Sequence, residues 1–145
     1  MLPVDLARRL HAAGLRWTPA PGDRFVLPDR GMDDDVFVIS DMTVEVHEFP
    51  TATVIGFNGT TEWALDSVEQ HEALWLPHEH QLRDLLGGLF RSLARDGDTW
   101  TVTLALPDAA AGPREHRVSA DGPAGAVQAY ALALADVLED VTSPV

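Results

Sequence analysis

Residues 36–59 read VFVISDMTVEVHEFPTATVIGFNG, and this stretch decides the fold class. Apolar and β-branched residues alternate with polar ones at the period of two that half-buried strands follow. The breaks between the apolar runs are short, and Asn58-Gly59 is a strong signal for a tight hairpin. Short breaks exclude repeated helical crossovers. The stretch therefore predicts an antiparallel meander, continued by a strand at residues 61–65.

Helical patterns lie on both sides of this meander. Apolar residues recur at helical spacing from Leu82 to Leu93 and again from Val127 to Val141, which predicts two long helices. Leu6 and Leu10, followed by Gly14, predict a short helix at the N-terminus. Further strands are predicted at residues 24–27, 98–106 and 114–120, and a turn-rich loop at residues 28–35.

Together these elements predict an α+β fold. We expect an antiparallel sheet of about five to six strands, with the two long helices packed on one face and the short N-terminal helix beside them. The chain has 145 residues, close to the usual size of one domain, and shows neither an internal repeat nor a linker. A single globular domain over residues 1–145 is therefore expected.

The composition limits the classes of partner. The formal net charge is −13, and all ten basic residues are arginine. Such a chain is repelled by phosphate backbones and anionic lipid surfaces, so we expect no nucleic acid and no membrane as partner. The sequence has no cysteine, no signal-peptide pattern and no long apolar run, and a cytoplasmic location is expected.

No phosphate loop, nucleophile elbow or H-E-x-x-H motif occurs in the sequence. This favours a non-enzymatic binding or accessory protein that recognises a protein partner or a small ligand. One candidate surface is an open sheet face carrying Glu45 and His47, with Glu62 on a neighbouring strand. The other is the loop around Trp17, with Arg24 nearby. Trp17 has two interpretations, either as a recognition residue or as an anchor that packs the loop onto the core.

Two alternatives remain open at this stage. A small metal-dependent or acid–base enzyme would use Glu45 and His47 with the histidines of QHEALWLPHEHQL, namely His71, His78 and His80. The spacing of these histidines differs from that of standard helical sites, so no cofactor is predicted, and elemental analysis of untagged protein would separate this alternative from a binding protein. The other alternative is a self-associating module, such as a homodimer through a sheet edge or the last helix.

The stretches RWTPAPGDRF, VIGFNGTTEWALDS and LWLP followed by QLRDLLGG resemble a family of small uncharacterised actinobacterial proteins. Some members are labelled as pilus-assembly proteins of the CpaE type. That type is similar to the MinD-like ATPases, which depend on a glycine-rich phosphate loop with a lysine. No position of this sequence matches that loop, so the resemblance implies no ATPase residue here.

Overall fold

The computed structural model describes residues 1–28, 32–39, 44–48, 53–57, 67–69, 73–107 and 112–142. The chain divides into two compact units. Unit 1 comprises residues 1–15 and 77–145, and unit 2 comprises residues 16–76. The single-domain organisation expected from the sequence stays a prediction.

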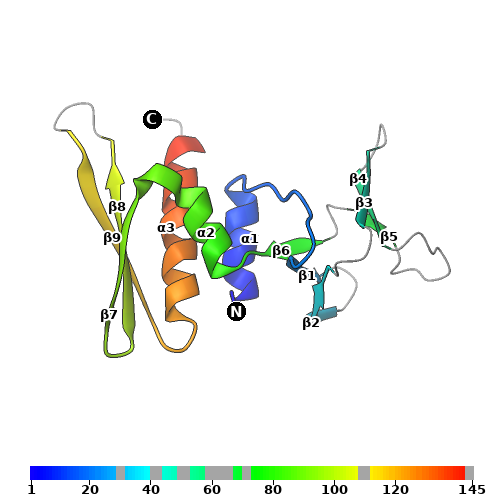
Figure 1. The fold of residues 1–145 in the computed structure, drawn as a ribbon, viewed down its shortest axis with the longest axis horizontal. Coiled ribbons are helices and arrows are strands. Elements are labelled where there is room, and N and C mark those ends of the chain that lie inside the picture. Colours follow the sequence, from blue (N-terminus) through cyan, green and yellow to red (C-terminus); the bar gives the residue numbers. More distant parts are fainter. Residues whose placement is uncertain are drawn as a thin grey trace. The chain divides into compact units, whose positions relative to one another are not determined.

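Unit 1 contains a meander of three antiparallel strands (Figure 1). The strands β7 (Phe90–Asp96) and β8 (Thr99–Leu106) are joined by a tight turn, in which Gly97 has a φ of 61° that glycine adopts at little cost. The strand β9 (Arg114–Asp121) then pairs with the whole of β8. The strand predictions for residues 98–106 and 114–120 are confirmed.

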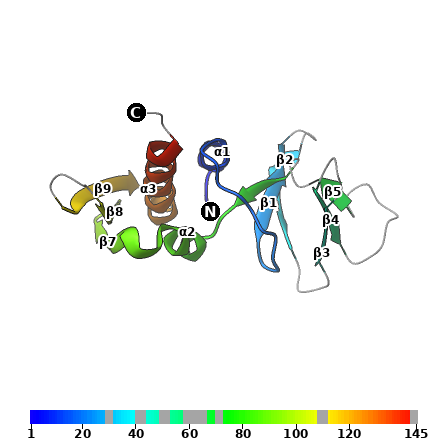
Figure 2. The same cartoon turned by 90° about the horizontal axis from the view of Figure 1, so that it is seen from above.

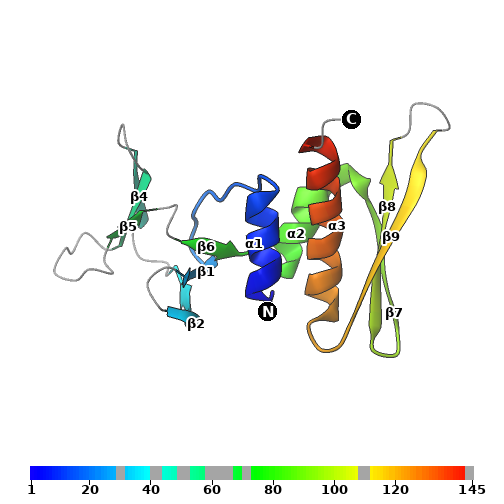
Figure 3. The same cartoon turned by 180° about the vertical axis from the view of Figure 1, so that it is seen from behind.

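One face of this sheet is covered by α3 (Gly125–Thr142), which packs on β8 and β9. The helices α1 (Val4–Ala12) and α2 (Glu79–Leu86) pack against α3, which lies between the sheet and α1 (Figures 2 and 3). The described buried residues of α3 are Gly125, Val127, Ala129, Tyr130, Ala131, Ala133, Leu134 and Ala135. They occupy almost the whole circumference, as expected for a helix with neighbours on opposite sides.

The helix predicted from Leu82 to Leu93 is wrong beyond Leu86. Gly87 ends α2 with a φ of 54°, a 3₁₀ turn follows at Gly87–Leu89, and β7 begins at Phe90. The pairing register with β8 shifts between Phe90 and Ser92, so that Phe90 and Leu93 both stand opposite inward-facing residues of β8. Because of this bulge, Phe90 and Leu93 lie on one face of the sheet although they are three residues apart. In the sequence, that spacing is typical of a helix.

Unit 2 contains two separate three-stranded sheets. In the first, β1 (Arg24–Leu27) lies between β2 (Met32–Val38) and β6 (Leu74–Leu76). The second is a meander of β3 (Val44–Glu48), β4 (Thr53–Phe57) and β5 (Ser67–Glu69). The loop predicted at residues 28–35 is wrong from Met32 onward, because β2 begins there and includes the acidic run Asp33–Asp35. The strand predicted at residues 61–65 lies outside the described residues.

The α+β class is therefore confirmed, whereas the arrangement of the strands differs from the prediction. The described strands form three antiparallel sheets of three strands each, and not one sheet of five or six. Pairing explains the difference, because β1 takes its second neighbour from β6, almost fifty residues further along the chain. None of the described helices combines the length and the apolar character that crossing a bilayer requires.

The contact between α3 and the sheet leads to a prediction for Gly125. A Cβ atom at Gly125 would lie 2.6 Å from Cδ1 of Trp100 and 2.9 Å from the carbonyl oxygen of Ala120. Gly125→Ala therefore forces the helix away from the sheet, and we expect it to lower the free energy of unfolding by about 1–3 kcal/mol in guanidinium chloride titrations.

Gly88→Ala is the matched control, since nothing lies within 4 Å of a Cβ at that position. We expect it to change the free energy of unfolding by no more than about 0.5 kcal/mol. Equal effects of the two substitutions would contradict the close approach of α3 to β8 and β9.

Candidate functional site

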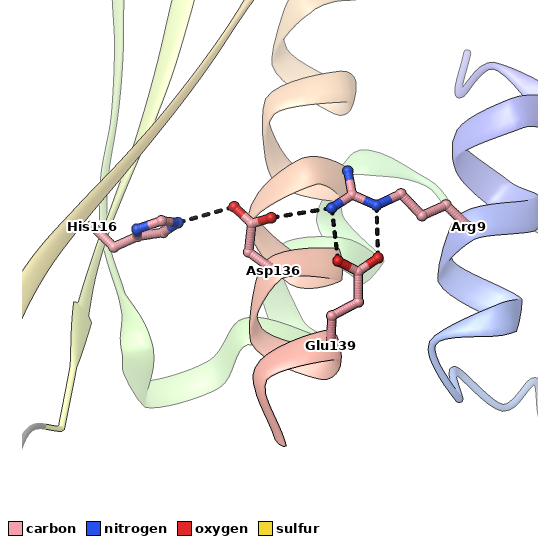
Figure 4. Close-up of polar contacts among 4 residues, drawn as sticks. All are labelled: Arg9, His116, Asp136 and Glu139. Carbon is pink, nitrogen blue, oxygen red and sulfur yellow. Dashed lines mark hydrogen bonds and ion pairs between the residues drawn. The ribbon is translucent and has the colours of Figure 1, made fainter. Parts of the chain in front are cut away.

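Four polar side chains from three elements of unit 1 form a connected network (Figure 4). Arg9 of α1 donates two hydrogen bonds to the carboxylate of Glu139 on α3, one from Nε at 2.8 Å and one from Nη2 at 2.9 Å. The same Nη2 lies 3.2 Å from Oδ1 of Asp136. On the other side of Asp136, Oδ2 lies 3.0 Å from Nε2 of His116 on β9. We call these four residues the Arg9–His116 network.

The charges of this network are mutually stabilising. The hydrogen bond from Arg9 lowers the pKa of the Glu139 carboxyl below its ordinary value of 4.5. The same bond, with the nearby charge of Asp136, raises the pKa of the Arg9 guanidinium. The paired geometry of guanidinium and carboxylate is the stronger form of ion pair. The ion pairs of Arg9 therefore hold α1 against α3 at neutral pH, and the hydrogen bond between His116 and Asp136 joins β9 to α3.

Sequence reasoning missed the Arg9–His116 network. Asp136 and Glu139 are three residues apart near the end of a mainly apolar helix, which places them on one side of it. That spacing is the one feature of the sequence that indicates a polar site on this helix. Their partners Arg9 and His116 are far away in the sequence, so the pairing is visible only in the folded chain.

The sheet of unit 1 offers a second feature, the face turned away from α3. Trp100, Val102 and Leu104 of β8 point to the helix side, so the alternate residues of the three strands point the other way. We call this second set the outer face. It consists of Ser92, Ala94, Asp96, Thr99, Thr101, Thr103, Ala105, Glu115, Arg117, Ser119 and Asp121.

Hydrogen bonds between neighbouring strands order the side chains of the outer face. The hydroxyl groups of Thr101 and Ser119 lie 2.8 Å apart, and Thr99 donates to Oδ1 of Asp121 at 2.6 Å. Arg117 lies 3.3 Å from Glu115. Most side chains of the face are thus short, three pairs of them are held by contacts across or along the strands, and all remain partly or fully exposed.

The charge of this region differs from that of the rest of the chain. Residues 90–121 carry four arginines and five acidic residues. The remainder carries six arginines and eighteen acidic residues. The strands of unit 1 are therefore nearly neutral in a strongly acidic protein, so another acidic surface is repelled less by them than by the chain as a whole.

Trp17 lies in the core of unit 2 and is only 8% exposed. Its ring stacks near Trp75, with centroids 6.4 Å apart, and lies 5.5 Å from the ring of Phe25. Its indole Nε1 donates to Oδ2 of Asp23 at 2.8 Å. This burial agrees with the interpretation of Trp17 as a packing anchor. The binding role of Trp17 stays a prediction.

Asp23 is the buried acceptor that holds this loop. Its side chain is 4% exposed, and the backbone N–H of Ala20 donates to the same Oδ2 at 3.1 Å. The nearby Arg24 stands on β1 opposite Val38 and Leu76. Its Nε is buried and has no hydrogen-bond partner in the described part of the chain. These contacts assign a structural role to the loop.

The other predicted site residues are placed less completely. Glu45 and His47 are alternate residues of β3, opposite Gly56 and Val54 of β4, so the strands predicted there are confirmed. Glu62 lies outside the described residues. The binding role of all three stays a prediction.

Two of the predicted metal-binding histidines, His78 and His80, lie at the start of α2. His78 precedes the helix, and its backbone N–H donates to the side chain of Gln81 at 2.8 Å in a capping box. The rings of His78 and His80 are stacked, with centroids 5.5 Å apart. His71 lies outside the described residues. Within the described ranges, no three His, Cys, Asp or Glu side chains gather as a metal site would require.

The contacts of Asp23 generate a stability prediction. Asp23→Ala leaves the indole N–H of Trp17 and the N–H of Ala20 without their buried acceptor, so we expect a loss of about 1–3 kcal/mol in the free energy of unfolding. Urea titration measures it. The exposed Asp84 of α2 is the control, and Asp84→Ala is expected to change stability by less than about 0.5 kcal/mol. A loss no larger than that of the control would contradict the structural role of Asp23.

The lowered pKa of Glu139 predicts a pH dependence. The stabilisation is complete above the ordinary value of 4.5, where the carboxylate is ionised in folded and unfolded chains alike. It is lost as the pH falls through the lower pKa of the folded state. Glu139→Gln should therefore lower the melting temperature at pH 7. The difference in melting temperature between this variant and the wild type should shrink as the pH falls through the pKa of Glu139 in the folded chain.

Asp140→Asn is the control for this experiment, because Asp140 is an exposed residue of the same helix. Its effect on the melting temperature should be small at pH 7. A difference between the wild type and Glu139→Gln that stays constant from pH 7 to about pH 3 would show that the carboxylate charge is not responsible.

Comparison with known proteins adds no family assignment: no family model, no curated protein and no solved structure matches this chain. The resemblance to a family of small actinobacterial proteins stays an expectation from the sequence.

Proposed function

We propose that this protein is a non-enzymatic binding or accessory protein that holds a protein partner on the outer face of the β7–β8–β9 sheet. The observation that carries the proposal is the set of ordered hydroxyl groups on that face. Thr101 and Ser119 are already paired across the strands, as are Thr99 and Asp121. Their positions are thus set before a partner arrives.

The character of these side chains supports recognition. Each hydroxyl group has one donor and two acceptor sites, so a Thr–Ser pair keeps capacity for further hydrogen bonds. Short side chains lose less rotamer entropy on binding than long charged ones, and pre-ordered groups lose less still. A partner therefore gains contacts here at a small entropic cost.

The shape and charge of the face indicate the class of partner. Small-molecule sites are usually concave and mostly apolar, whereas this face is an extended surface of small polar residues on three strands. Such a surface fits another protein surface better than a small ligand. The near-neutral charge of residues 90–121 adds to this, since an acidic partner is repelled less strongly there than by the chain as a whole.

Site-specific photo-crosslinking in the native host tests this proposal. A photoreactive amino acid at the exposed Ser92 position should give a discrete protein adduct, while the same residue at Asp84 of α2 should not. Adding Thr101→Arg should reduce the Ser92 adduct about tenfold, because a long charged side chain in the middle of the face prevents close contact.

Circular dichroism of each variant separates loss of binding from loss of folding. The proposal fails if Ser92 gives no adduct, if Asp84 gives the same adduct, or if Thr101→Arg leaves the adduct unchanged in a folded protein.

A further inference from the structure

The strand β9 lies at an edge of its sheet. One side of β9 pairs with β8 from Arg114 to Asp121, and in the described part of unit 1 no strand pairs with its other side. An edge strand presents unpaired backbone N–H and C=O groups, which are a template for a further strand. Charged side chains often protect such edges, so their arrangement decides whether this edge repels or accepts a partner.

We propose that β9 pairs with β9 of a second copy of this chain, antiparallel and centred on Ser119. A two-fold axis perpendicular to the sheet relates the copies, so residues that meet across the axis lie on the same face. Centring on Ser119 places Arg117 of each copy opposite Asp121 of the other. It also places Val118 opposite Ala120, and Ser119 opposite its own counterpart.

All pairs in this register are favourable. Arg117 and Asp121 are exposed and opposite in charge, Val118 and Ala120 are half-buried and apolar, and two serine hydroxyl groups can share a hydrogen bond. Opposite charges directly across two strands stabilise the pairing, and like charges destabilise it. Every charged residue in the paired segment 117–121 therefore meets its complement.

Other registers of the same strand are poorer. Centring on Arg117 sets two arginines against each other, and centring on Val118 sets Glu115 against Asp121. Centring on His116 pairs Glu115 with Arg117 but sets two histidines opposite each other. In the edge strand β7, the register centred on Leu93 is unfavourable, because it places Arg91 opposite Arg95.

Long-range charge also favours β9 as the meeting place. Two copies of a chain with a net charge of −13 repel each other, but residues 90–121 are close to neutral. Pairing through β9 joins two three-stranded sheets into one of six strands and brings the two outer faces side by side. This inference is independent of the proposed partner, since either interaction can exist without the other.

The expected dimer is weak. Five paired residues bury far less surface than the roughly 1,200–2,000 Å² of a stable interface, so dissociation constants between about 10 μM and 1 mM are expected. Sedimentation velocity over a concentration series is suited to that range. The wild-type chain should shift from monomer to dimer as its concentration rises.

Charge reversal tests the register. Arg117→Asp gives each edge two acidic groups that face each other across the axis, and Asp121→Arg gives two basic groups. Each variant alone should dimerise about tenfold more weakly than the wild type. The reason is that the two symmetric pairs of residues 117 and 121 then carry like charges, which repel each other. An equimolar mixture of the two variants should regain wild-type association, since the new aspartate of one meets the new arginine of the other.

Asp84→Arg is the matched control, because Asp84 is an exposed residue of α2 outside the paired segment, and the same reversal of charge there should leave dimerisation unchanged. The proposal is overturned if the wild type stays monomeric up to about 1 mM, if both reversals associate like the wild type, or if Asp84→Arg weakens the dimer as much as Asp121→Arg. Where circular dichroism shows that a reversal does not fold, Arg117→Asn and Asp121→Asn replace it, with a smaller loss of association expected.

Discussion

The burial of α3 on both sides is the constraint on which unit 1 depends. The helix packs on β8 and β9 and is itself covered by α1 and α2. Small alanine residues along it allow this close approach, and Gly125 lets its first turn reach Trp100 and the backbone of Ala120. A helix in this position cannot carry polar groups without partners, because burying an unpaired polar group costs free energy.

The same constraint explains where the polar groups of α3 occur. Asp136 and Glu139 lie toward its C-terminal end, where the side chains are partly exposed, and both carboxylates are paired with Arg9 or His116. The resulting Arg9–His116 network links the helices to the sheet near the C-terminal end of α3, where the side chains are no longer fully buried. Apolar contacts supply most of the adhesion, while the network fixes which parts of α1 and β9 face α3.

Covering one face of a three-stranded sheet leaves its outer face and its two edges for other uses. The outer face has ordered hydroxyl groups and a near-neutral charge, and the β9 edge has a self-complementary charge pattern. Both features support a protein that acts through contacts with other protein chains. Unit 2 contributes differently, since its aromatic cluster around Trp17 and Asp23 is directed inward and stabilises the unit itself.

The sequence by itself determined the α+β class, the helices at both ends of the chain, and the strands whose apolar residues alternate, because these depend on local periodicity. It did not determine that residues 90–96 form a strand, since a bulge gives Phe90 and Leu93 a helical spacing. Only the tertiary structure decided that β1 pairs with β6, that Trp17 is buried, and that Arg9 and His116 meet the carboxylates of α3. These contacts join residues that are distant in the chain, and local patterns carry no information about which distant partner a residue meets.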